Sequence, residues 1–229
     1  MEEIKALTER TSDAIVSYII KQELKEGERL PTETELMKIL DVSRTTLREA
    51  IKMLASRNIV EARQGSGIFV SRNTGITDDP LGFVFIKDKK KLVSDLLEFR
   101  MMIEPRIAAR AAINATQKDA EELEYLAREV EKMYELGKSH KTEDAKFHAK
   151  LGEISGNLVF PNLMPIIFQA IDMFIASTNA ELKYETIDTH RAIVEAVKRN
   201  DPDAAEDAMM MHLIYNRNYL RNHNDRTID

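Results

Sequence analysis

Hydrophobic residues recur at helical spacing along most of this chain, and the pattern changes after about its first third. Residues 1–72 give three short helical patterns followed by two short alternating segments. Residues 92–222 give a series of longer helical patterns with no convincing strand. The pattern therefore predicts a mainly α protein, in which a small domain with a β-hairpin precedes an all-helical bundle.

A linker is expected between these two regions. The segment "NTGITDDPLGFVFIKDKKK" mixes turn residues, an apolar patch and a lysine run. We therefore expect domains at 1–75 and 92–229, joined by a linker at 76–91. The apolar patch favours a short helix within this linker, packed through Leu81, Phe83, Val84 and Phe85.

The first helix is expected at about 8–25, ending before Gly27, with three isoleucines facing inward: Ile15, Ile19 and Ile20. The segment "LPTETEL" predicts a second helix running to about Leu40. Thr32 would cap that helix, and Glu35 three residues later completes the pattern of a capping box.

A third helix follows after a short turn. Ser43 is a typical N-cap residue, and the helix begins at Arg44. Its first turn carries Arg44 and Arg48, although the helix dipole favours negative charge there by roughly 0.3–1 kcal/mol per group. Two short helices joined by a tight turn, with Arg and Thr at the start of the second, indicate a helix-turn-helix that inserts into a DNA major groove.

Two short alternating segments come next and predict a β-hairpin. They span Ile59 to Arg63 and Ile68 to Ser71, around the turn Gln64-Gly65-Ser66-Gly67. A hairpin in this position is the wing of a winged helix. Its glycines would let the backbone approach a phosphate or a minor groove. A hairpin without a DNA-binding role is the alternative. DNA binding is favoured by the order of the elements: a capped helix, a turn, a helix that begins with Arg and Thr, and a Gly-rich hairpin.

Charge is distributed unevenly along the chain. The 229 residues carry a net charge of −6, yet residues 42–75 contain six Lys or Arg and two Glu, so this segment carries +4 and the remainder −10. A solvated basic face would give the same count, but a basic segment on an acidic chain also fits a local polyanion site. The chain has no cysteine and no visible export signal. Its most apolar stretch, 158–176, contains polar residues and prolines typical of a buried core helix. We expect a cytoplasmic protein without a membrane span.

The second region places polar residues on apolar helix faces. Asp144 and His148 lie one turn apart on one stripe, and His190 and His212 lie on the apolar faces of two later helices. A buried Asp is costly unless it is paired. Three histidines and one aspartate converging in a bundle would suit a divalent metal ion such as Zn²⁺, with Ni²⁺ or Mn²⁺ as alternatives. Hydrogen-bonded core histidines would explain the same spacing.

Arg100 also points inward, on a stripe shared with Val93, Leu96, Ile103 and Ile107. Inside a bundle its guanidinium needs an anion. One interpretation is a salt bridge to a core-facing acid such as Asp144 or Glu104. The other is a clamp for the carboxylate of a small ligand.

The segment "RLPTETELMKILDVSRTTLREAIKMLASRNIVEARQGSGIFV" resembles the winged-helix domain of GntR-family bacterial transcription regulators. The resemblance implies DNA contacts from six residues: Arg44, Thr45, Thr46, Arg48, Gln64 and Gly65. The chain departs from the family at Thr34, where many relatives carry an arginine that reaches DNA. The operator sequence therefore cannot be copied from a relative.

The helical region resembles the FadR-type effector domain of this family, known as FCD. The segments that carry this resemblance are "DLLEFRMMIEPRIAARAA", "FHAKLGEISGN" and the two His-bearing helices. In the metal-binding branch of this domain an Asp and three His hold the ion, and Asp144, His148, His190 and His212 fall on those positions. The branch that binds fatty acyl-CoA lacks these histidines, so that ligand is disfavoured.

These features lead to one functional hypothesis and two rivals. The hypothesis is a homodimeric regulator that binds a palindromic double-stranded DNA operator, senses a small carboxylate through a metal-containing domain, and acts as a repressor. One rival is a sensor whose signal is the metal ion itself. The other is a metal-dependent hydrolase, which lacks a convincing general base because helical phase turns Glu143 and Glu153 away from the metal stripe.

Overall fold

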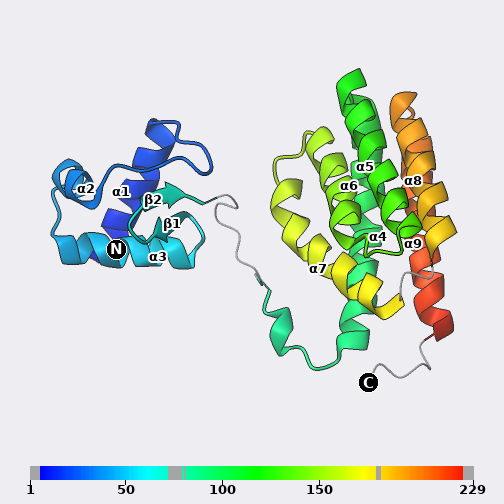
Figure 1. The fold of residues 1–229 in the computed structure, drawn as a ribbon, viewed down its shortest axis with the longest axis horizontal. Coiled ribbons are helices and arrows are strands. Elements are labelled where there is room, and N and C mark those ends of the chain that lie inside the picture. Colours follow the sequence, from blue (N-terminus) through cyan, green and yellow to red (C-terminus); the bar gives the residue numbers. More distant parts are fainter. Residues whose placement is uncertain (1–5, 72–78, 80, 179–181, 224–229) are drawn as a thin grey trace, which may run out of the picture. The chain divides into compact units, whose positions relative to one another are not determined.

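The structure is a computed structural model that describes residues 6–71, 79, 81–178 and 182–223. The chain forms two compact units, residues 1–80 and 81–229. Figure 1 shows a small first unit with a β-hairpin and a larger unit built from long helices. The chain is therefore mainly helical, as the hydrophobic pattern predicts.

The first unit is a winged helix-turn-helix. Its elements in chain order are α1 (Leu7–Lys21), α2 (Glu33–Leu40), α3 (Arg44–Ser56), β1 (Val60–Arg63) and β2 (Gly67–Val70). The two strands pair antiparallel, with Val60 opposite Val70 and Arg63 opposite Gly67. Side chains from all five elements meet in one core, which includes Ile15, Leu36, Leu47, Leu54, Val60 and Ile68. Burial of these apolar faces holds the short helices and the hairpin together.

Both predicted helix caps are present in this unit. The Thr32 hydroxyl accepts a hydrogen bond from the Glu35 amide, and the Glu35 carboxylate accepts one from the Thr32 amide at 2.8 Å. The Ser43 hydroxyl accepts a hydrogen bond from the Thr46 amide at 3.2 Å. These caps fix where α2 and α3 begin, and so fix which residues occupy the first turn of α3.

The first helix differs from the prediction in two ways. It ends at Lys21 rather than near 25, because Glu23 adopts a left-handed conformation with φ of 53° and the Leu24 amide bonds back to the Ile19 carbonyl. Ile15 and Ile19 are buried as predicted, but Ile20 is 70% exposed. The inward prediction for Ile20 was wrong, since successive helical residues lie about 100° apart and the core stripe continues through every fourth residue.

The second unit is an all-helical bundle (Figure 1). Its helices are α4 (Lys89–Asn114), α5 (Gln117–Glu135), α6 (Lys141–Ile154), α7 (Phe160–Thr178), α8 (Lys183–Lys198) and α9 (Pro202–His223). The long helix α4 packs against α6, α7, α8 and α9. Its inward residues therefore face side chains from four other helices.

The linker contains a single 3₁₀ turn, η1 (Phe83–Phe85), among its described residues. Phe83 packs against a small apolar cluster formed by Leu92 and Leu96 of α4 and Ala170 of α7. Leu81, Val84 and Phe85 are exposed, so the prediction that they pack was wrong. A turn of three residues cannot bury a complete apolar stripe. Part of the predicted linker, residues 76–78 and 80, lies outside the described residues.

The apolar stretch at 158–176 forms most of α7. Met164, Ile167 and Ile171 of this helix are buried in the bundle core. Among the described residues, no helix combines the length and the apolar character needed to cross a membrane. The stretch is thus a core helix, as its interrupting polar residues and prolines indicate.

Candidate functional site

The first two turns of α3 present polar and cationic side chains on the surface. Arg44, Thr45 and Arg48 are exposed, while the Thr46 hydroxyl lies 2.8 Å from the Ser43 hydroxyl. Arg44 has no ion-pair partner among the described residues. Nε of Arg48 lies 3.1 Å from Oε2 of Glu33 on α2, with the Arg48 side chain 57% exposed. An exposed pair of this kind contributes only about 0–1 kcal/mol, so Arg48 can exchange it for another anion.

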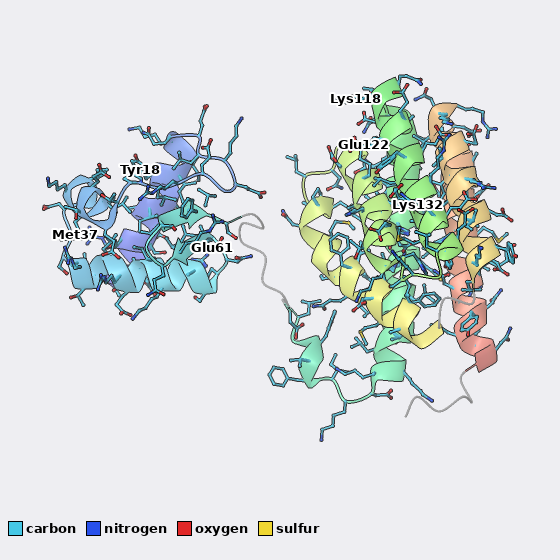
Figure 2. The ribbon with its side chains drawn as sticks, in the orientation of Figure 1. Tyr18, Met37, Glu61, Lys118, Glu122 and Lys132 are labelled. Carbon is cyan, nitrogen blue, oxygen red and sulfur yellow. The ribbon has the colours of Figure 1, made fainter. Side chains whose placement is uncertain are left out.

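The wing places its turn on the surface as well. Gln64 and Gly65 are exposed, and Gly65 has a φ of +72°, a conformation that L-side chains rarely adopt. Figure 2 labels Glu61 on β1, where its carboxylate pairs with Arg63 at 3.0 Å. The Arg63 guanidinium also lies over the Phe69 ring, 4.4 Å from its centroid. The hairpin is therefore held by its own side chains up to the turn.

Three histidines from three helices meet inside the second unit. His148 of α6, His190 of α8 and His212 of α9 are buried, and one ring nitrogen of each lies within 4.8 Å of the other two. Within the part of the chain that the structure describes, neither ring nitrogen of His190 has a hydrogen-bond partner. A buried nitrogen without a partner costs about 1–3 kcal/mol, unless a ligand or an ion satisfies it.

Asp144 joins this cluster from one turn before His148. Its carboxylate oxygens lie 3.5 Å from Nε2 of His190 and 3.8 Å from Nε2 of His148. The side chain is buried, as its position on the apolar stripe predicts. The structure therefore brings together all four residues that the sequence nominates, with Asp144 beside two of the three histidines.

Thr189 orients one of the histidines. Its hydroxyl donates to the Glu185 carbonyl at 2.6 Å and lies 3.0 Å from Nδ1 of His212. Since a hydroxyl has one proton, it must accept from Nδ1 when it donates to the carbonyl. That assignment places the lone pair of His212 on Nε2, which Nδ2 of Asn216 approaches to 3.5 Å. A hydrogen bond to the ring nitrogen that faces away from the metal fixes the tautomer of a metal-binding histidine.

Glu104 and Arg100 orient a second histidine. Oε2 of Glu104 lies 2.6 Å from Nδ1 of His148, and Nη2 of Arg100 lies 3.2 Å from Nε2 of the same ring. Arginine can only donate, so Nε2 is the acceptor and Nδ1 carries the proton. Arg100 also pairs with Glu104 at 2.5 Å, and both side chains are buried. The predicted salt bridge between Arg100 and Glu104 is thus present.

Burial shifts the ionisation of several groups in this cluster. It lowers the pKa of His190 and of His212 well below the usual imidazole value, and the charges of neighbouring histidines act in the same direction. Burial alone would raise the pKa of Glu104, but Arg100 and His148 hold that pKa well below its ordinary value. His190 and His212 are therefore neutral imidazoles, the form that binds metal ions, while the Glu104 carboxylate is ionised beside Arg100 and His148.

His140 is a site residue that sequence reasoning missed. It is buried, stacks on the Tyr134 ring at 4.1 Å, and its Nε2 lies 3.0 Å from the Tyr134 hydroxyl. Both residues line a small pocket whose walls also include Arg100, Asp144, Thr186, His212 and Asn216. The helical pattern gives no signal for His140, because it precedes α6 in a polar stretch.

The order of these parts defines a class of protein. A winged helix-turn-helix joined to a larger helical domain is the architecture of a DNA-binding regulator. The chain matches the family model "Bacterial regulatory proteins, gntR family" over residues 7–70 and the FCD domain over residues 95–214. It belongs to the GntR family of bacterial regulators and carries an FCD effector domain.

Known relatives agree with this assignment. The solved structure of Streptococcus agalactiae GntR is 40% identical, has a TM-score of 0.82, and the match covers 92% of this chain and 99% of that one. The Uxu operon transcriptional regulator of Escherichia coli is 32% identical over 87% of this chain and 80% of its own length. The E. coli transcriptional repressor NanR is 29% identical over 91% of this chain and 82% of its own. The chain is therefore a transcriptional regulator.

Proposed function

We propose that this regulator binds a palindromic double-stranded DNA operator as a homodimer and represses transcription until a small organic acid binds. Pairing of two chains would present two winged helices to successive half-sites of the operator. The relative NanR is named as a transcriptional repressor, which supports repression. The winged helix-turn-helix and the match to the GntR family support the binding of DNA.

One observation carries the DNA assignment. The two arginines at the start of α3 are exposed rather than buried, and Arg44 has no ion-pair partner among the described residues. Cations at a helix N-terminus weaken the helix by themselves, so an external anion accounts for them best. In a major groove, Arg44 and Arg48 would meet base edges or phosphates, with Thr45, Thr46, Gln64 and Gly65 beside them.

We further propose that Asp144, His148, His190 and His212 hold a divalent ion. The unpartnered nitrogens of His190 and the lowered pKa values of two of the histidines support this. Imidazole and carboxylate donors suit Zn²⁺, and Ni²⁺ or Mn²⁺ also fit. Such an ion would supply a Lewis-acidic position to which a ligand carboxylate can bind.

Arg100 is the proposed second contact of that carboxylate. It is buried beside the cluster, and it would give up its hydrogen bond to Nε2 of His148 whenever that nitrogen ligates an ion. Its released donors could then bind an anion, while Glu104 continues to hold the guanidinium. The proposed effector is therefore a small carboxylate metabolite rather than a long acyl chain.

The experiment that tests the DNA assignment compares the full-length protein with Arg48→Ala on a duplex selected from a random pool by the wild type. We expect specific binding to weaken by roughly 1–3 kcal/mol with the melting temperature unchanged. Arg106→Ala is the matched control, since Arg106 is an exposed arginine of α4 paired with Glu206. Equal affinity of Arg48→Ala and wild type would count against the proposal.

A further inference from the structure

Arg29 is held against the base of the wing by backbone pairing. The backbone of Arg29 forms an isolated antiparallel β-bridge with the backbone of Phe69 in β2. On either side, the Leu30 amide donates to the Ile68 carbonyl at 2.8 Å, and the Val70 amide donates to the Glu28 carbonyl at 2.8 Å. The segment before α2 therefore continues the wing sheet beyond β2, and the position of Arg29 is fixed by main-chain hydrogen bonds.

The guanidinium of Arg29 lies directly over Gly67, where the wing turn ends. A Cβ at residue 67 would stand 2.9 Å from Nε and 3.1 Å from Nη2 of Arg29. The φ of Gly67 is +112°, so the backbone conformation favours glycine, and a side chain there would also displace the Arg29 guanidinium. Because residue 67 has no side chain, the Arg29 guanidinium can lie next to the turn formed by Gln64 and Gly65.

The charge of Arg29 is not neutralised by an ion pair within the described part of the chain. Two nearby carboxylates are engaged by local donors, because Glu28 accepts from the Lys25 amide and Glu35 accepts from the Thr32 amide and hydroxyl. After those Thr32 hydrogen bonds, the Arg29 charge is a further cause of the lowered pKa of Glu35. Arg29 is therefore an exposed cation near both the wing and the first turn of α2.

We propose that Arg29 binds a DNA phosphate beside the wing and supplies a cation that Thr34 does not. Thr34 lies exposed in the first turn of α2, where it has no charge to offer. The main-chain hydrogen bonds place this guanidinium beside Gly67, and its planar fork suits a bidentate contact to phosphate. This inference rests on the proposed DNA-binding function and adds a residue from outside the helix-turn-helix and the wing turn.

The test measures how operator affinity depends on salt. The full-length wild type, Arg29→Gln and Arg29→Lys are titrated with the selected duplex at 50 to 200 mM NaCl. The measured quantity is the slope of the logarithm of the association constant against the logarithm of the salt concentration. Loss of one phosphate contact makes this slope shallower by about 0.9. The ratio of wild-type affinity to Arg29→Gln affinity should therefore fall roughly threefold between 50 and 200 mM NaCl. Arg29→Lys keeps the charge and should keep the slope.

Arg57→Gln is the matched control, because this exposed arginine lies at the opposite end of α3 from Arg44. We expect its slope to match that of the wild type. The inference is overturned if Arg29→Gln has the wild-type slope, or if Arg29→Lys loses as much slope as Arg29→Gln, since the residue would then act through packing alone. If the wild type enriches no duplex, the proposed function itself fails. If Arg48→Ala weakens binding but Arg29→Gln does not, only the inference fails.

Discussion

At the scale of single residues, the four polar residues that meet in the internal cluster were predictable, but the groups that contact them were not. Asp144, His148, His190 and His212 stand out in the sequence because each is polar on an apolar helical stripe. Thr189 and the link from Glu104 to His148 were not predicted, since they depend on which helices become neighbours. A hydroxyl or a carboxylate in a helix gives no signal of its own until the facing side chain is known.

The supporting groups lead to a prediction about metal affinity. His190→Ala should lose the bound ion, and Thr189→Val should bind it about 10–100-fold more weakly, because Nδ1 of His212 loses the hydroxyl that orients it. Metal content after dialysis, measured by mass spectrometry following incubation with Zn²⁺, Ni²⁺ or Mn²⁺, checks both variants. His223→Ala is the control, since its histidine is outside the ligand set. If the wild-type protein retains none of these ions, the proposal of a metal site is wrong.

At the scale of elements, helix identity followed from periodicity, whereas helix ends and exposed faces depended on local geometry. The capping motifs at Thr32 and Ser43 were readable in the sequence and located two helix starts. The sequence did not predict where α1 ends, because Glu23 rather than a glycine adopts the left-handed conformation that follows the helix. The prediction of a packed helix in the linker failed, because Val84 and Phe85 are apolar but exposed in a short turn.

Close packing of α6 on α7 supports a second prediction. A Cβ on Gly152 of α6 would overlap Cδ1 of Phe160 and lie 2.6 Å from Cε1 of the same ring. Alanine normally stabilises a helix interior relative to glycine by about 1 kcal/mol, so the expected sign here is reversed. Gly152→Ala should destabilise the bundle by about 1–3 kcal/mol through overpacking, measured as denaturant unfolding. Phe160→Leu in the same chain should recover part of the loss. An increase in stability in Gly152→Ala would contradict the packing.

At the scale of the whole molecule, the two units divide the work of a regulator. The first carries the exposed cations of α3 and the wing, and the second encloses the polar cluster of α4, α6, α8 and α9. The family resemblance in the sequence predicted this division, because its motifs cover both units. The identity of the proposed effector does not follow from the fold, since one fold serves many ligands and the side chains of the site decide among them. Coupling between the units requires that the effector favours one of two arrangements of the protein.

The most direct measurement is operator affinity of the metal-loaded, full-length protein with and without a carboxylic acid that raises its melting temperature. Such an acid is found by a thermal-shift screen, because a ligand of the folded state stabilises it by mass action. Binding of the acid should change operator affinity by about 5–150-fold, the usual range of allosteric coupling. Unchanged operator affinity with the acid bound would contradict the account of an effector-controlled regulator.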